Sequence, residues 1–286
     1  MIEPAIAVLP YGGKLGRRLA ARPLADLQWP LGCPARLEGG VVGDLSPDDH
    51  LIVYAKTAMH IQPNWNCRAH VSLMVMEPKA ISHFHHRMLR ITHRRFFRVF
   101  THDPDLLQRL PNALFLPFGT TWIPDWQDRR LEKSEDLSLI ASAKRDLEGH
   151  QLRHQMVEFL RQERPDARIL GRGYTPFEVK ADGLAPFRYS VVIENVQEPN
   201  YFSEKLIDAI LCETVPIYWG CPNIETFFDT QGIICCSGLA DLKAAVRSIS
   251  EEDYQRRLPA LRAIKPLAAD LGDLPRRAAE ALRDSL

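Results

Sequence analysis

The sequence predicts an α/β protein made of two Rossmann-like domains, and three observations lead to this prediction. Short apolar runs rich in β-branched residues alternate with polar or helical stretches, which is the pattern of parallel sheets covered by helices. The 286 residues allow one large or two medium-sized domains that each bury a core. A charged stretch containing Gly119 and Pro124, residues 119–136, separates two such regions and predicts a linker.

Residues 1–118 are predicted to form the first domain. Its predicted strands are the apolar runs Ile6–Leu9, Leu51–Tyr54, Val71–Met76, Phe96–Phe100 and Ala113–Phe118. We expect Ile81–Arg94 to be helical, and we expect Asp103 and Pro104 to be the N-cap and first position of another helix. The alternative for Asp103 is one half of a metal-holding pair with Asp105.

Glu77 is a candidate site residue of the first domain. Pro78 cannot continue the hydrogen-bond ladder of a strand, so the strand Val71–Met76 should end at Glu77. Ligands of α/β domains bind at the carboxyl ends of the strands, where this carboxylate would lie. The alternative is a surface glutamate that caps the following helix.

Histidines and arginines alternate in the segment that follows. The histidines are His83, His85, His86, His93 and His102, and the arginines are Arg87, Arg90, Arg94, Arg95 and Arg98. Histidines at this density suggest a metal site, but the interleaved cations disfavour a divalent ion. We therefore favour a basic helix face that meets an acidic or phosphorylated acceptor.

Residues 137–264 are predicted to form the second domain. Its outer elements are the strands Leu137–Ala141, Ala167–Leu170 and Gly232–Cys236 and the helices Gly149–Arg161 and Leu239–Ile249. Ser142 and Lys144 follow the first strand, and Arg153 lies in the first turns of the next helix. A phosphate at that helix N-terminus would gain from the dipole and from the guanidinium.

The remaining C-terminal segment is helical and charged. Residues 265–286 predict a C-terminal helix, which we expect to pack back on the first domain. Breaks in the helical segment that starts near Glu251 are expected at Pro259, Pro266 and Pro275.

The most informative stretch, residues 188–228, predicts a strand, a loop, a helix, a second strand and a turn. Tyr189–Ile193 and Val215–Trp219 are the strands, and Ser203 is a good N-cap for the helix between them. Five polar residues fall where such a unit binds ligands: Glu194, Asn195, Tyr201, Glu204 and Lys205. The plain alternative is a solvated first helical turn.

The spacing of these residues resembles a known motif. The pattern E-N-x5-Y-x-[ST]-E-K-L-x-x-A, followed by V-P-I-Y-W-G-x-P, resembles the donor-binding signature of the family 10 glycosyltransferases. These enzymes are α-1,3/α-1,4-fucosyltransferases. The resemblance implies a GT-B fold, two Rossmann-like domains facing a cleft, and inverting transfer of fucose from GDP-fucose to a hydroxyl of a carbohydrate acceptor, such as a glycan or lipopolysaccharide. With Lys205, Arg153 and a helix N-terminus available to neutralise the diphosphate, we expect that no cofactor and no metal is required.

The resemblance implies roles for individual residues. Glu77 would be the general base on the acceptor hydroxyl, and Arg153 and Lys205 would contact the donor phosphates. Glu204 would bind the ribose hydroxyls, Asn195 and Tyr201 would line the nucleotide pocket, and Glu194 would position the sugar or order that pocket. Ser142, Lys144 and Ser203 are weaker donor-side candidates.

Two further functions stay open. Ile193 and Cys221 depart from the family pattern beside the polar positions, so the donor could be another nucleotide sugar. The chain could also be a non-catalytic nucleotide-sugar-binding protein that lacks the base.

The composition argues against several classes of protein, namely nucleic-acid-binding, zinc-binding and membrane-spanning proteins. Lys plus Arg and Asp plus Glu both number 36, so no bulk positive charge indicates nucleic acid as a partner. The six cysteines form no C-x-x-C pair, which argues against zinc and suits a reducing cytosol. No signal peptide is evident, and no apolar run approaches the roughly 18 residues of a membrane span. We expect a soluble, bacterial-type cytoplasmic protein with at most peripheral membrane contact.

Overall fold

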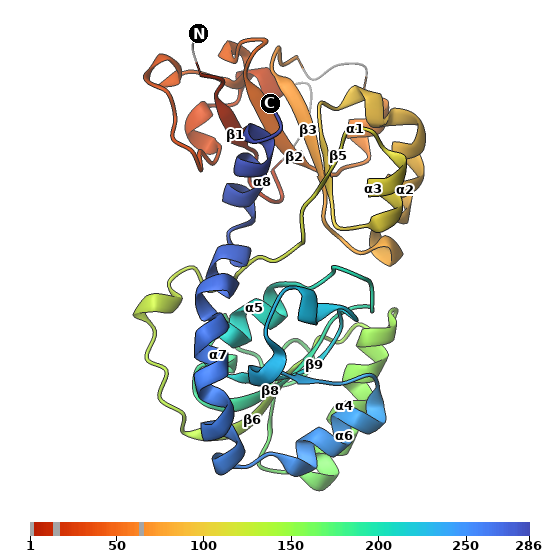
Figure 1. The fold of residues 1–286 in the computed structure, drawn as a ribbon, viewed down its shortest axis with the longest axis vertical. Helices are drawn as coiled ribbons and strands as arrows, with labels where there is room; N and C mark the ends of the chain where they lie inside the picture. The colour runs from red at the N-terminus through yellow and green to blue at the C-terminus, as the bar shows by residue number, and fades with distance from the viewer. Residues whose placement is uncertain (1–2, 14–17, 63–65) are drawn as a thin grey trace. The chain divides into compact units, whose positions relative to one another are not determined.

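The computed structural model describes residues 3–13, 18–62 and 66–286. The chain forms two compact units, one made of residues 1–118 with 274–286 and the other of residues 119–273. Each unit is built on a five-stranded sheet whose neighbouring strands are all parallel (Figure 1).

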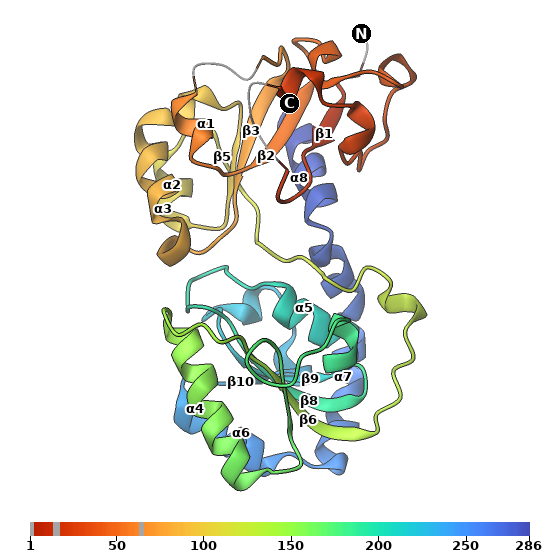
Figure 2. The ribbon, with the colours of Figure 1, turned by 180° about the vertical axis from the view of Figure 1, so that it is seen from behind.

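The first sheet has its strands side by side in chain order. They are β1 (Ile6–Val8), β2 (His50–Tyr54), β3 (His70–Val75), β4 (Val99–Thr101) and β5 (Ala113–Phe115). Because every right-handed crossover then moves the same way along the sheet, all crossover segments fall on one face. The helices α1 (Ala58–Ile61), α2 (Lys79–Thr92) and α3 (Pro104–Arg109) accordingly lie together on one side of the sheet (Figure 2).

The helix α8 (Leu274–Arg283) covers the opposite face of this sheet. Strand residues alternate between the two faces, so Ile52 and Met74 pack with α8, whereas Leu51 and Leu73 join the core under α1–α3. Arg98 adds hydrogen bonds from Nε to Ser285 Oγ (3.0 Å) and from Nη2 to Ser285 O (2.8 Å). When all crossover helices lie on one face of a sheet, the other face stays uncovered. In this unit the C-terminal helix α8 covers that face.

The second sheet has the order β7-β6-β8-β9-β10. Its strands are β6 (Glu135–Ile140), β7 (Arg168–Leu170), β8 (Phe187–Ile193), β9 (Val215–Trp219) and β10 (Ile234–Cys235). The chain leaves β6 in one direction and β8 in the other, so helices cover both faces. On one face are α4 (Glu148–Glu163) and α6 (Leu239–Ser248), and on the other are α5 (Glu204–Leu211) and α7 (Glu251–Gly272) (Figure 1).

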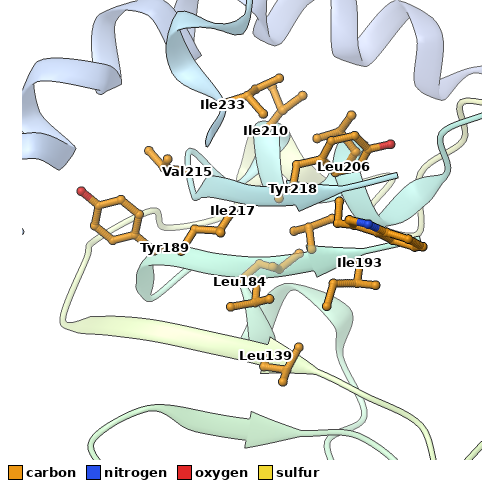
Figure 3. Close-up of a cluster of buried hydrophobic side chains, with 14 of the residues drawn as sticks. Leu139, Leu184, Tyr189, Ile193, Leu206, Ile210, Val215, Ile217, Tyr218 and Ile233 are labelled. Carbon is orange, nitrogen blue, oxygen red and sulfur yellow. The ribbon is translucent and has the colours of Figure 1, made fainter. Parts of the chain in front are cut away.

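The core of the second unit joins the central strands to α5. Ile193 and Ile217 from the strands and Leu206 and Ile210 from the helix are each at most 2% exposed (Figure 3). Central strands buried on both faces give continuous apolar runs, which is why the sequence located β8 and β9 well. This packing holds the start of α5 firmly beside the end of β8.

Two predictions about element boundaries were wrong. The helix α7 continues through Pro259 and Pro266, because both face solvent, where water can bond the carbonyl that each proline leaves unpaired. The chain breaks at Asp273 instead, so residues 265–272 complete α7 in the second unit and only 274–286 belong to the first.

Residues 119–136 belong to the second unit and do not form a separate linker. Asp208 of α5 holds their first part, since its Oδ1 accepts hydrogen bonds from Thr121 Oγ1 (2.6 Å) and Trp122 N (3.1 Å). Among the described residues, no helix is long and apolar enough to cross a bilayer.

Candidate functional site

The strand order of the second unit locates a candidate site before any side chain is considered. Parallel strands β6 and β8 are neighbours, but the chain leaves them in opposite directions. In open α/β sheets, ligands bind at the carboxyl ends of the strands at this switch point. The loop after β6, residues 141–147, and the loop after β8, residues 194–203, therefore border the site, together with the N-termini of α4 and α5.

Glu194 is the buried centre of this region. Its side chain is 0% exposed, and its Oε1 accepts hydrogen bonds from Ser203 N (2.8 Å) and Ser203 Oγ (2.9 Å). Its Oε2 lies 2.7 Å from Ser203 Oγ and 3.3 Å from Lys205 Nζ. A charged group without solvent must be paired and hydrogen-bonded in this way. The geometry therefore favours the second role predicted for Glu194, that of ordering the pocket.

Lys205 lies between two carboxylates in the first turn of α5. Its Nζ is 3.3 Å from both Glu194 Oε2 and Glu204 Oε1, and it donates to Ser203 Oγ at 2.9 Å. Burial alone would lower the pKa of Lys205, but Glu194 and Glu204 outweigh it and raise the pKa above its ordinary value. The ammonium therefore stays charged, and its side chain remains 24% exposed.

Glu204 is the more accessible of the two carboxylates. Its side chain is 9% exposed, against 0% for Glu194. Burial would raise the pKa of Glu204, yet the Lys205 ammonium and Lys180 hold it below its ordinary value. An ionised carboxylate at this position can accept hydrogen bonds from ligand hydroxyl groups.

Arg153 reaches from α4 to the end of β8. Its Nε and Nη2 donate to Ile193 O at 3.0 and 2.6 Å, and Nη2 also donates to Asn195 Oδ1 at 2.9 Å. Within the described parts of the chain, no hydrogen bond reaches its third nitrogen, Nη1. The guanidinium joins the two loops at the switch point and keeps the two N–H groups of Nη1 for a further partner.

Two glycines let the backbone approach Glu194 closely. A Cβ on Gly149 would lie 1.8 Å from Glu194 O, and one on Gly220 would lie 2.6 Å from Glu194 Cγ. Gly149 N also donates to Asn195 O (3.0 Å), which fixes the start of α4 against the loop after β8. Any larger residue would push these loops apart.

The other candidates of the second unit differ in accessibility. Ser203 is the N-cap of α5, as predicted, but its hydroxyl faces Glu194 and the residue is 1% exposed. Tyr201 is equally buried. Ser142 is half-buried and Lys144 is exposed, both in the loop after β6. Lys144 therefore offers an accessible cation in the loop that leads into α4.

Glu77 belongs to the first unit, whereas the candidates above belong to the second. It lies two residues beyond the end of β3, after Met76, and is half-buried at the carboxyl end of the first sheet. Pro78 holds the N-cap position of α2, and Ser82 Oγ donates to Glu77 O at 2.9 Å.

Asp103 is a helix cap. Its Oδ1 accepts a hydrogen bond from Leu106 N (2.8 Å), and Pro104 begins α3. Asp105 pairs with Arg109 (3.4 Å) and Lys79 (3.6 Å). Over residues 3–13, 18–62 and 66–286, no cluster of three or more His, Cys, Asp or Glu side chains could hold a metal ion.

Sequence reasoning missed several residues that shape the site. Asn223, after β9, accepts from Asn200 N and donates to Asn200 Oδ1, both at 2.9 Å, which ties the loop after β8 to the next turn. Lys180 acts on Glu204 and lies over the Trp122 ring at 5.3 Å. Asn223 follows the W-G-x-P turn and could have been suspected, but Lys180 begins a single short 3-10 helix, Lys180–Gly183, that no sequence pattern predicts.

Comparison with known proteins extends this description. No protein-family model matches the chain. A segment of 55 residues, 19% of the chain, is 34% identical to alpha-(1,3)-fucosyltransferase FucT of Helicobacter pylori. The match spans only 12% of the length of that protein. The resemblance to fucosyltransferases predicted from the motif is thus confirmed for part of the chain.

Similar solved structures cover most of the chain. An alpha1,3-fucosyltransferase with GDP-fucose aligns with a TM-score of 0.50 and 15% identity, over 80% of each chain. Anabaena Alr3699/HepE in complex with UDP and glucose aligns at 0.52 and 13% identity, over 82% of this chain and 78% of that one. At such identity these likenesses establish the fold, and the predicted α/β fold of the GT-B class is confirmed.

Proposed function

From the resemblance to family 10 fucosyltransferases and the GT-B fold, we propose that this chain is a glycosyltransferase that uses a nucleotide-sugar donor. GDP-fucose is the donor that the motif favours, and a hydroxyl of a carbohydrate is the acceptor. The observation that carries the proposal is the pair of cations, Arg153 and Lys205, which lie at the starts of α4 and α5 around the switch point.

The donor diphosphate would bind between these two helix starts. Two charges of each sign, on Arg153, Lys205, Glu194 and Glu204, balance within the site. The helix N-termini and exposed Lys144 add the positive potential that a diphosphate needs. Glu204 can turn from Lys205 to the ribose hydroxyls, which frees one N–H of Lys205 for a phosphate oxygen. Arg153 offers Nη1 to the same group.

Transfer would proceed by a single inverting displacement. Glu77 would take the proton of the acceptor hydroxyl as that oxygen attacks the anomeric carbon and the bond to the diphosphate breaks. Lys205 and Arg153 would stabilise the negative charge that develops on the departing GDP. With these cations in place, the mechanism needs no divalent metal.

A panel of nucleotides tests the donor. GDP and GDP-fucose should raise the unfolding temperature of the protein, and UDP, ADP and CMP should not. If only UDP-sugars raise the unfolding temperature, the donor is a UDP-sugar rather than GDP-fucose. The assignment of the fold is unaffected by that result. Slow release of fucose from GDP-fucose, or its transfer to an acceptor, distinguishes the enzyme from a binding protein.

Lys205 supplies a test of the site within the same panel. Lys205→Ala should weaken GDP binding by about 1.5–3 kcal/mol, the contribution of a charge-assisted hydrogen bond. It should also lower the unfolding temperature without ligand, because Glu194 loses its cation. A matched control is Lys243→Ala on α6, which should leave GDP binding unchanged. Equal GDP affinity in both variants would remove Lys205 from the site.

A further inference from the structure

The outer surface of α2 combines two features that globular surfaces normally keep apart. Large apolar side chains are exposed there, namely Ile81 (43%), Phe84 (38%) and Ile91 (77%). Ile61, at the end of α1, is 68% exposed, and its neighbour His60 contacts the Phe84 ring at 5.9 Å. Figure 2 shows α1 and α2 together at the outer side of the first unit.

The same surface is strongly basic. Between Pro78 and Asp103 the chain has six Lys or Arg residues and no Asp or Glu, although the whole chain is neutral. Arg87, Arg90 and Arg94 are exposed, and none of them pairs with an acid within the described residues. Lys79, by contrast, is paired with Asp105 at 3.6 Å.

The spacing places cations beside apolar groups. Arg87 follows Phe84 by three residues and precedes Ile91 by four, so all three lie along one stripe of the helix. Arg94 follows Ile91 by three residues, at the start of the next turn. Beyond it, a hollow of about 400 Å³ opens with Arg94, Arg95 and His70 in its wall.

We propose that this surface, which we call the α2 face, docks on an anionic lipid bilayer. Isoleucine and phenylalanine side chains would enter the upper acyl region, while the arginines extend to the lipid phosphates around them. The hollow beside Arg94 and Arg95 has room for one phosphate headgroup. A nucleic-acid surface would not explain four exposed large apolar side chains, and an apolar protein partner would not explain the unpaired arginines. The proposal does not depend on the donor.

Vesicle flotation with the full chain tests this proposal. The protein should float with vesicles of phosphatidylcholine and phosphatidylglycerol and should not float with phosphatidylcholine alone. Raising the salt to about 0.5 M should weaken the binding. The variant Arg87→Gln/Arg90→Gln/Arg94→Gln should partition about 100-fold more weakly, from roughly a factor of five per cation.

Two further variants make the result decisive. Arg247→Gln/Arg256→Gln/Arg262→Gln removes the same charge from exposed positions of the second unit and should bind like the parent. Phe84→Ser/Ile91→Ser should bind at least tenfold more weakly while the unfolding temperature stays close to that of the parent. The proposal is overturned if the parent does not float with anionic vesicles, if the two arginine variants lose binding equally, or if the serine variant binds like the parent.

Discussion

Replacing Glu194 by glutamine tests the structural basis of the candidate site. The variant keeps the size of the side chain and one acceptor oxygen, so the bond from Ser203 N is retained in a weaker, neutral form. It removes the charge that Lys205 Nζ approaches at 3.3 Å and replaces Oε2, which Ser203 Oγ approaches at 2.7 Å, with an amide. The change therefore affects the electrostatics of the site while its volume stays constant.

The magnitude follows from the burial of the pair. Breaking a buried ion pair by neutralising one partner costs about 3–5 kcal/mol. Here the cost should be lower, about 2–3 kcal/mol, because Lys205 keeps Glu204 and is 24% exposed. For a unit of this size, each kcal/mol lowers the unfolding temperature by about 2–4 °C. We therefore expect a decrease of about 5–10 °C for Glu194→Gln.

Thermal unfolding followed by circular dichroism measures this effect. Glu158→Gln is the matched control, because Glu158 is an exposed glutamate on α4, and its replacement should change stability by less than about 0.5 kcal/mol. A loss of one kcal/mol of stability lowers the unfolding temperature by at least about 2 °C. If Glu194→Gln unfolds within about 2 °C of this control, Glu194 does not act as a buried charged centre.

Four further outcomes are expected. Gly149→Ala should destabilise the protein by at least about 1–3 kcal/mol in denaturant unfolding, since its Cβ would lie 1.8 Å from Glu194 O, whereas Gly238→Ala, with no atom within 4 Å, should be tolerated; equal midpoints would contradict the close approach. Burial raises the pKa of Asp208 from 3.8 to about 7, so this carboxyl lowers stability as the pH rises through that range; the unfolding temperature of Asp208→Asn relative to the parent should increase between pH 5 and pH 8, and parallel profiles would refute the assignment. Glu77→Gln should reduce turnover by about 10² or more with GDP-sugar affinity nearly unchanged, and turnover within a few-fold of the parent would exclude Glu77 as the base. Activity should survive EDTA, and loss that manganese restores would show that the proposed metal-free mechanism is wrong.

The central strands of both sheets could be predicted from sequence because they are buried on both faces, which gives continuous apolar runs. Val215–Trp219 coincides with β9, and Val71–Met76 is offset from β3 by one residue at each end. The helix N-caps could also be predicted from sequence, since Ser203 and Asp103 are N-caps in the structure. These signals depend on neighbours in the chain, which a sequence displays directly.

Features that depend on distant contacts were not predictable in this way. The burial of Glu194 and the inward reach of Arg153 depend on the close approach allowed by Gly149, and nothing in a strand-end glutamate distinguishes a buried group from a solvated one. Asp208 binds Thr121, 87 residues away, which attaches the expected linker to the second unit. Pro259 and Pro266 do not end α7, although proline usually ends a helix, because water can bond the carbonyl groups that these exposed prolines leave unpaired.

A crystal structure of the protein with bound GDP-fucose tests the central claim most directly. We predict that the diphosphate lies at the β6–β8 switch point, with phosphate oxygens about 2.7–3.2 Å from Arg153 Nη1 or Lys205 Nζ. The ribose hydroxyls should lie at the same distance from a Glu204 carboxylate that has turned away from Lys205. A diphosphate bound elsewhere, with Glu204 still paired to Lys205, would contradict the proposed site.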